Sequence, residues 1–166
     1  MAYFFFLVGP AASGKSTVAK MIKKKLNFKY IEGDKFHSLK NINLIRREIK
    51  LKFTDRLPWL NRINKKLKIY AKSNIKFIIS CSALKKKYRT ILSKGLPNTF
   101  FFYLKCKKSV LIKRVNLRHH FFPLSLLNDQ ISSFEISKDL FIINSNKNIN
   151  NVIRKISKKT NILIKK

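Results

Sequence analysis

The chain has 166 residues, which suits a single compact domain, and it carries 38 Lys and Arg against 7 Asp and Glu, a formal net charge of +31. No apolar run is long enough to span a bilayer, and the two cysteines show no metal or disulfide spacing, so we expect no membrane association and a cytoplasmic location. The basic residues are scattered over every segment rather than gathered in one stripe. We therefore expect no specific nucleic-acid partner, only adhesion to polyanions at low salt.

A phosphate-binding loop is the clearest motif. Residues 3–8 are apolar and β-favouring, residues 9–16 fit G-x-x-x-x-G-K-[ST], and residues 17–26 have helical spacing. Strand, glycine loop and helix in this order predict a nucleotide site, in which Lys15 reaches the β- and γ-phosphates and Ser16 ligates Mg²⁺. The residues expected to bind the nucleotide are Gly9, Pro10, Ala11, Ala12, Ser13, Gly14, Lys15, Ser16 and Thr17.

The second predicted strand, residues 28–31, is followed by a carboxylate at Asp34. Ligands of open α/β sheets bind beyond the carboxyl ends of the strands. Asp34 is therefore a candidate to accept a proton from an attacking hydroxyl or to hold a water on Mg²⁺, and a helix N-cap role is compatible with either. For His37, a capping or substrate-contact role and an ordinary surface position are equally compatible with the sequence.

The rest of the chain continues the alternation of strands and helices. A helix through Tyr70 follows residues 55–60, and further helices are predicted up to about Lys94 and over 109–117, 124–134 and 149–156. Strands are predicted over 77–80, 99–104 and 139–144, and residues 160–166 are expected to be a frayed tail. Five strands alternating with helices predict an α/β fold with a parallel sheet, in one domain over residues 1–159.

Three arginines and one tryptophan deserve separate interpretations. Arg56 is either an anion ligand or a solvated arginine, and Trp59 is most simply a core residue. Arg114 and Arg118 share a helix face beside a break at 119–123, which is typical of a lid that closes on transferring phosphate. Two exposed arginines in a basic chain are the alternative. The lid would span about 114–135.

Several segments together resemble the bacterial thermoresistant-type gluconokinases, P-loop sugar-acid kinases related to shikimate kinase. They occur in family order and cover most of the chain, from Tyr3 to about Asp139. The segments are Gly9 to Ser16, Gly33-Asp34 with His37, Asn41-Ile42, Asp55-Arg56-x-Pro58-Trp59-Leu60, Cys81 to Lys86 with Tyr88-Arg89, Tyr103-Leu104, Arg114 and Arg118, His120 to Phe122, and Phe134-Glu135. The sequence departs from the family pattern at 47–54 and 136–139.

The resemblance implies a three-layer α/β/α P-loop NTPase fold and ATP-dependent transfer of the γ-phosphoryl group to the 6-hydroxyl of D-gluconate. It also implies that a homodimer is possible. The alternatives are a kinase for another hydroxy acid such as shikimate, or a catalytically eroded basic nucleotide-binding protein. The implied catalytic residues are Lys15, Asp34, Arg114 and Arg118, the implied substrate-binding residues are Asp34, His37, Arg56, Lys85 and Arg89, and Ser16 is the implied metal ligand.

Overall fold

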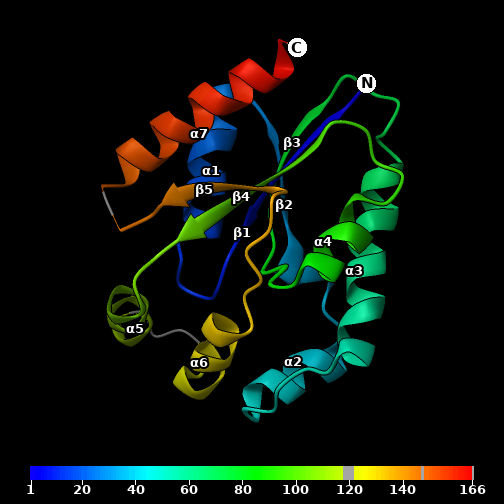
Figure 1. Ribbon diagram of the computed structural model, residues 1–166. Helices are drawn as coiled ribbons and strands as arrows, with labels where there is room; N and C mark the ends of the chain where they lie inside the picture. The colour runs from blue at the N-terminus through cyan, green and yellow to red at the C-terminus, as the bar shows by residue number, and fades with distance from the viewer. Residues whose placement is uncertain (118–121, 147, 166) are drawn as a thin grey trace.

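Five parallel strands form one sheet in the order β2-β3-β1-β4-β5 in the computed structural model, which describes residues 1–117, 122–146 and 148–165 (Figure 1). The strands are β1 (Tyr3–Val8), β2 (Lys29–Glu32), β3 (Lys76–Ser80), β4 (Thr99–Lys105) and β5 (Leu140–Asn144). Every neighbouring pair is parallel. The five predicted strands and the parallel sheet are thus confirmed.

Helices cover both faces of the sheet, because the strands are apolar on both sides. Helices α1 (Lys15–Leu26) and α7 (Ile149–Ile164) cover one face, and α3 (Phe53–Lys68) and α4 (Lys86–Ser93) cover the other (Figure 1). Along β1 the phenylalanines alternate between the two cores: Phe4 and Phe6 pack with the α3 side, and Phe5 packs with the α1 side. This is the three-layer α/β/α fold expected of a P-loop kinase.

The remaining helices gather beyond the carboxyl ends of the strands. They are the short 3₁₀ helix η1 (Gly33–Phe36), α2 (Leu39–Arg46), α5 (Lys108–Leu117) and α6 (Leu124–Ser132) (Figure 1). The expected lid segment corresponds to the end of α5 and to α6, whereas residues 118–121, which include Arg118, lie outside the described residues. The topology therefore places the ligand-binding end of the sheet beside these helices.

Two boundaries differ from the sequence expectation. Helix α7 continues to Ile164, so the expected tail over 160–166 is helical through 164, with Thr160 fully buried. The reason is that apolar spacing persists past residue 156, and Leu163 and Ile164 pack against the core of the α1 side. None of the described helices is long and apolar enough to cross a membrane.

The second difference concerns the Asp-Arg-x-Pro-Trp block, which lies inside α3 rather than before it. The helix begins at Phe53 because Asp55 caps it: its carboxylate accepts a hydrogen bond from the Lys52 backbone N–H at 2.9 Å. Since the helix is regular from this point, Arg56 and Trp59 lie on one continuous element.

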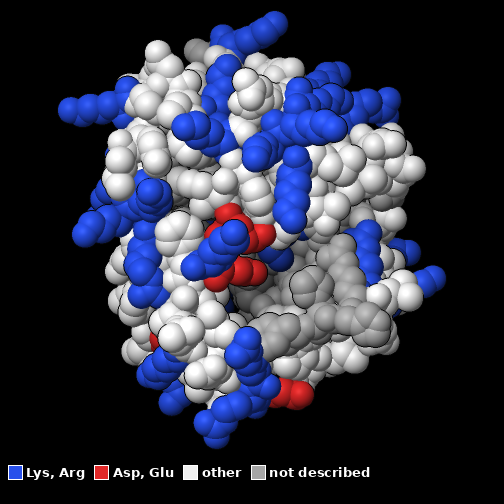
Figure 2. Space-filling view, turned by 180° about the vertical axis from the view of Figure 1, so that it is seen from behind, with Lys and Arg blue, Asp and Glu red and all other residues white. Residues whose placement is uncertain are grey.

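The charges are unevenly distributed. Lys and Arg are spread over the visible face in Figure 2, whereas the acids occupy a few places. Six of the seven carboxylates have a hydrogen bond or ion pair within the protein: Glu32, Glu48, Asp55, Asp129, Glu135 and Asp139. The seventh is Asp34, whose carboxylate has no hydrogen bond to any described residue.

Candidate active site

The P-loop joins β1 to α1 at the centre of the sheet. Gly14 is the N-cap of α1 with φ +98°, a conformation that side-chain-bearing residues rarely adopt. Lys15 is buried, and its ammonium group donates a hydrogen bond to the Pro10 carbonyl at 2.8 Å. Burial lowers the pKa of Lys15, while the nearby Asp34 acts in the opposite direction. An anionic ligand at the loop would offset that desolvation.

Asp34 is placed by a glycine that no other residue can replace. A Cβ on Gly33 would lie 2.6 Å from the Ser80 carbonyl oxygen, so β2 and β3 can meet at this point only with glycine. Asp34 follows, and its side chain is open to the cavity described below. Burial raises the pKa of Asp34, because the carboxylate is desolvated. The positive charges of Lys15 and Arg56 partly oppose this shift. The carboxylate is therefore within electrostatic reach of both the P-loop lysine and Arg56.

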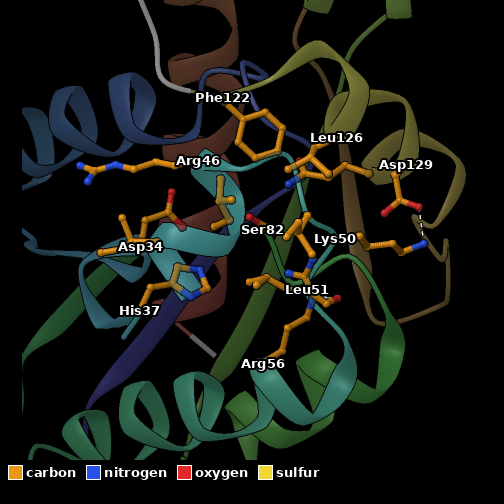
Figure 3. Close-up of a pocket in the computed structure, with 14 residues that line it drawn as sticks. Asp34, His37, Arg46, Lys50, Leu51, Arg56, Ser82, Phe122, Leu126 and Asp129 are labelled. Carbon is orange, nitrogen blue, oxygen red and sulfur yellow. Dashed lines mark hydrogen bonds and ion pairs between the residues drawn. The ribbon is translucent and has the colours of Figure 1, made fainter. Parts of the chain in front are cut away.

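A cavity of about 340 Å³ opens in front of Asp34 (Figure 3). It is lined by residues 34–56, which run from η1 through α2 into α3, and by Ser82, Phe122 and α6, which come later in the chain. Its polar lining comprises Asp34, His37, Arg46, Lys50, Arg56, Ser82, Asp129 and Gln130, and its apolar lining comprises Ile42, Ile45, Ile49, Leu51, Phe122 and Leu126. Charged and polar groups that converge between apolar side chains are typical of a site for a small polar ligand.

Arg56 lies on the wall of this cavity, as expected of an anion ligand. It is partly buried, and its Nε donates to the Leu51 carbonyl at 3.3 Å. Lys85 does not line this cavity. It lines a smaller one, of about 130 Å³, which shares Arg56 and Lys50 with the first. The two cavities are therefore adjacent, and Leu51 and Asp129 also line both.

Arg89 does not line this cavity, although the resemblance implied that it contacts the substrate. It is 1% exposed and pairs with Asp139 at 2.7 Å. Its other nitrogens donate to the carbonyls of Ala83, Leu84 and Glu135 and to the Ser137 hydroxyl. With its donors used in this way, Arg89 holds the segment 135–139 against residues 83–84, and this geometry does not support a substrate contact.

We expect Arg89→Met to destabilise the protein without changing the cavity wall. Removing one partner of a buried ion pair leaves Asp139 without its cation and the Ala83 and Glu135 carbonyls without this donor, which costs about 3 kcal/mol here because Asp139 is partly exposed. In a chain of this length that loss lowers the melting temperature by about 6–12 °C. The control is Arg154→Met on the exposed face of α7, for which thermal unfolding should be almost unchanged. Equal melting temperatures for the two variants would contradict this role for Arg89.

Arg114 reaches the P-loop from α5. One of its terminal nitrogens donates to the Ala12 carbonyl at 3.3 Å, and the other donates to the Ser145 carbonyl at 3.0 Å. The guanidinium group is therefore already beside the loop that would hold phosphate, which agrees with the position expected of it.

Gln130 contacts the P-loop from α6, a contact that no sequence pattern indicates. Its side-chain oxygen accepts a hydrogen bond from the Ala11 backbone N–H at 2.7 Å, and the residue is 7% exposed. The adjacent Asp129 forms an ion pair with Lys50. A glutamine in an amphipathic helix belongs to no motif, so only the fold reveals this contact.

The residues around Ser16 fit a hydrated Mg²⁺ ion held together with phosphates. Ser16 follows Lys15 in the loop, and Glu32 and Asp34 both act electrostatically on Lys15. Tyr30 contacts Ser16 and donates a hydrogen bond to Glu32, and burial raises the pKa of Tyr30 to about 12. Among the described residues no three acidic, His or Cys side chains form a metal cage. Phosphate oxygens and waters would therefore have to complete the coordination shell.

Comparison with known proteins agrees with this geometry. The family model of cytidylate kinase matches residues 6–94, which contain the end of β1, the P-loop, β2 and β3. The thermosensitive gluconokinase of Escherichia coli (strain K12) is 38% identical over 154 residues, covering 89% of this chain and 82% of that protein.

Of two similar solved structures, one resembles this chain in both sequence and fold, and the other resembles it in fold alone. A gluconokinase from Sinorhizobium meliloti 1021 is 32% identical with a TM-score of 0.81, over 92% of this chain and 88% of that one. Shikimate kinase from Bacteroides thetaiotaomicron has a TM-score of 0.71 at 15% identity, over 96% of this chain and 98% of that one, a likeness of fold alone. The P-loop, the carboxylate beside it and these similarities together show that the chain belongs to the gluconokinase family.

Proposed function

We propose that this protein transfers the γ-phosphoryl group of ATP to the 6-hydroxyl of D-gluconate, giving 6-phospho-D-gluconate. The position of Asp34 is the observation that carries the proposal. Asp34 lines the cavity together with Arg56, and both Lys15 of the P-loop and Arg56 act on its carboxylate electrostatically. A hydroxy acid whose carboxylate meets Arg56 would extend toward Asp34, where its hydroxyl can be deprotonated.

Each of these residues would have a separate role in the reaction. Lys15 and the amides of the P-loop hold the phosphates. Arg114 adds positive charge near the phosphoryl group that is transferred. Ser16 would hold Mg²⁺, which neutralises phosphate charge when bound. Asp34 orients the attacking hydroxyl and takes its proton. The apolar cavity wall limits access of water, which would otherwise compete as the acceptor.

The family favours gluconate over shikimate as the acceptor, and an assay distinguishes them. ADP release should depend on D-gluconate and should be far slower with shikimate at equal concentration. The blank is Lys15→Ala. Turnover with shikimate alone would move the protein to the alternative acceptor. ATP binding without turnover on either acid would favour the eroded nucleotide-binding protein.

For Arg56→Ala we expect a KM for gluconate that is raised about 10- to 100-fold, since a charge-assisted hydrogen bond contributes about 1.5–3 kcal/mol. The kcat should change much less, because a contact used equally in the ground and transition states acts on KM. Steady-state kinetics at saturating ATP measures both.

The matched control for Arg56 is Arg62→Ala. Arg62 lies on the same helix but is exposed, and its Nε donates to the Phe36 carbonyl at 2.9 Å. Its KM for gluconate should stay close to that of the wild type. A similar KM for both variants would place the carboxylate site elsewhere.

A further inference from the structure

The ring of His37 is held rigidly at the cavity wall. It stacks on Trp59, with ring centroids 4.2 Å apart and planes inclined by 14°. Trp59 is itself fully buried, and its indole N–H donates to the Gly33 carbonyl at 2.8 Å. His37 lines the cavity beside Asp34 (Figure 3). Because the stack fixes the plane of the ring, its two nitrogens have fixed surroundings.

Asn41 contacts one of those nitrogens. Its side chain is 2% exposed, and its Nδ2 lies 2.9 Å from the Asp55 carbonyl oxygen and 3.3 Å from His37 Nδ1. A carbonyl oxygen can only accept, so the atom facing Asp55 must be the amide NH₂ group. The second hydrogen of the same group then points to His37 Nδ1, which must accept it.

The ring is neutral in this environment. Burial lowers the pKa of His37 to about 4, and Arg56 and Arg62 of α3 add to this effect. Asp34 and Arg46 also line the cavity that the ring faces. A neutral imidazole whose Nδ1 accepts must carry its proton on Nε2.

We propose that Asn41 is a positioning residue that fixes His37 as the Nε2–H tautomer, so that the ring presents a hydrogen-bond donor to an oxygen of the acid substrate. The substrate role rests on the proposed function, whereas the tautomer does not. A donor at this point selects acids with a hydroxyl there, because an analogue lacking it leaves the buried N–H unpaired.

The tautomer can be measured without any substrate. Long-range ¹H–¹⁵N NMR of the labelled protein distinguishes the two neutral forms and the imidazolium, and a His37→Gln spectrum assigns the signal among the three histidines. At neutral pH we expect Nδ1 unprotonated and Nε2 protonated. A proton on Nδ1, or a charged ring, would overturn the proposal.

Asn41→Asp tests the positioning role, because a carboxylate cannot donate to Nδ1. We expect the proton to move to Nδ1 and the KM for gluconate to rise about tenfold, the loss of about one hydrogen bond, with kcat changed less. The control is Asn43→Asp on the exposed part of the same helix, which should change neither.

A second pair of variants covers the case in which Asn41→Asp does not fold. His37→Gln can still donate to a substrate oxygen, so its KM should be close to that of the wild type, whereas His37→Leu should show the tenfold increase. Equal KM values for Gln and Leu would overturn the substrate role. Absence of gluconate turnover in the wild type would refute the proposed function, and the spectrum would still decide the tautomer.

Discussion

Replacing Lys15 with alanine should abolish turnover, with kcat falling at least about a thousandfold, which corresponds to about 4 kcal/mol of transition-state stabilisation. Lys15 lies in the P-loop, where its charge would meet the phosphates as negative charge moves between them. Its ammonium group already lies within the loop, where it donates to the Pro10 carbonyl. The coupled ADP assay measures the loss.

The Lys15 variant should remain folded, because burial lowers the pKa of Lys15 and the charge therefore costs the empty protein free energy. Thermal unfolding checks this point. Lys20→Ala is the matched control, since Lys20 is exposed on the same helix and should leave kcat unchanged. Turnover in Lys15→Ala within tenfold of the wild type would refute the assigned role of the P-loop lysine.

The second large effect is expected for Asp34→Asn, which should lower kcat about 10²- to 10⁴-fold, the usual contribution of a positioned general base. Nucleotide affinity should be unchanged, because the P-loop is intact. The control is Asp129→Asn: this carboxylate lines the same cavity but is paired with Lys50, and a partly exposed pair contributes about 1 kcal/mol or less. Similar kcat values for the two variants would contradict the base assignment.

The pH dependence of kcat gives an independent check on Asp34. A general base works as the carboxylate, and desolvation raises the pKa of Asp34 above the ordinary value of an aspartate. The wild-type kcat should therefore fall as the pH falls through that raised pKa, and it should recover at higher pH. Asp34→Asn should lack this acidic limb while retaining its low residual rate.

The local parts of the molecule could be predicted from the sequence because short-range patterns determine them. The P-loop lies between a strand and a helix, and the five strands are apolar runs bounded by turn residues, so the fold and the placement of Lys15 and Asp34 followed. The sequence predicts the last helix only as far as Ile156, because residues 157–161 are polar before the apolar spacing resumes at Ile162. In the fold Thr160 is buried and donates to the Ser157 carbonyl, so the helix continues.

The long-range contacts could not be predicted in the same way. Arg89 looked like a substrate ligand because it follows a family motif, yet its partner Asp139 is 50 residues away in the chain. Gln130 and Ala11 are 119 residues apart. No periodicity or motif connects such positions. Only the packing of helices at the carboxyl ends of the strands brings them together.

Helix α6 touches both halves of the site through two consecutive residues, Asp129 toward Lys50 and Gln130 toward the Ala11 amide. A ligand that moves Lys50 or the P-loop amide of Ala11 therefore also moves α6, and this changes the surroundings of the other group. In equilibrium terms, we expect ATP and gluconate not to bind independently. Thermodynamic reciprocity then requires that saturating ATP shift the dissociation constant of gluconate by the same factor by which saturating gluconate shifts that of ATP.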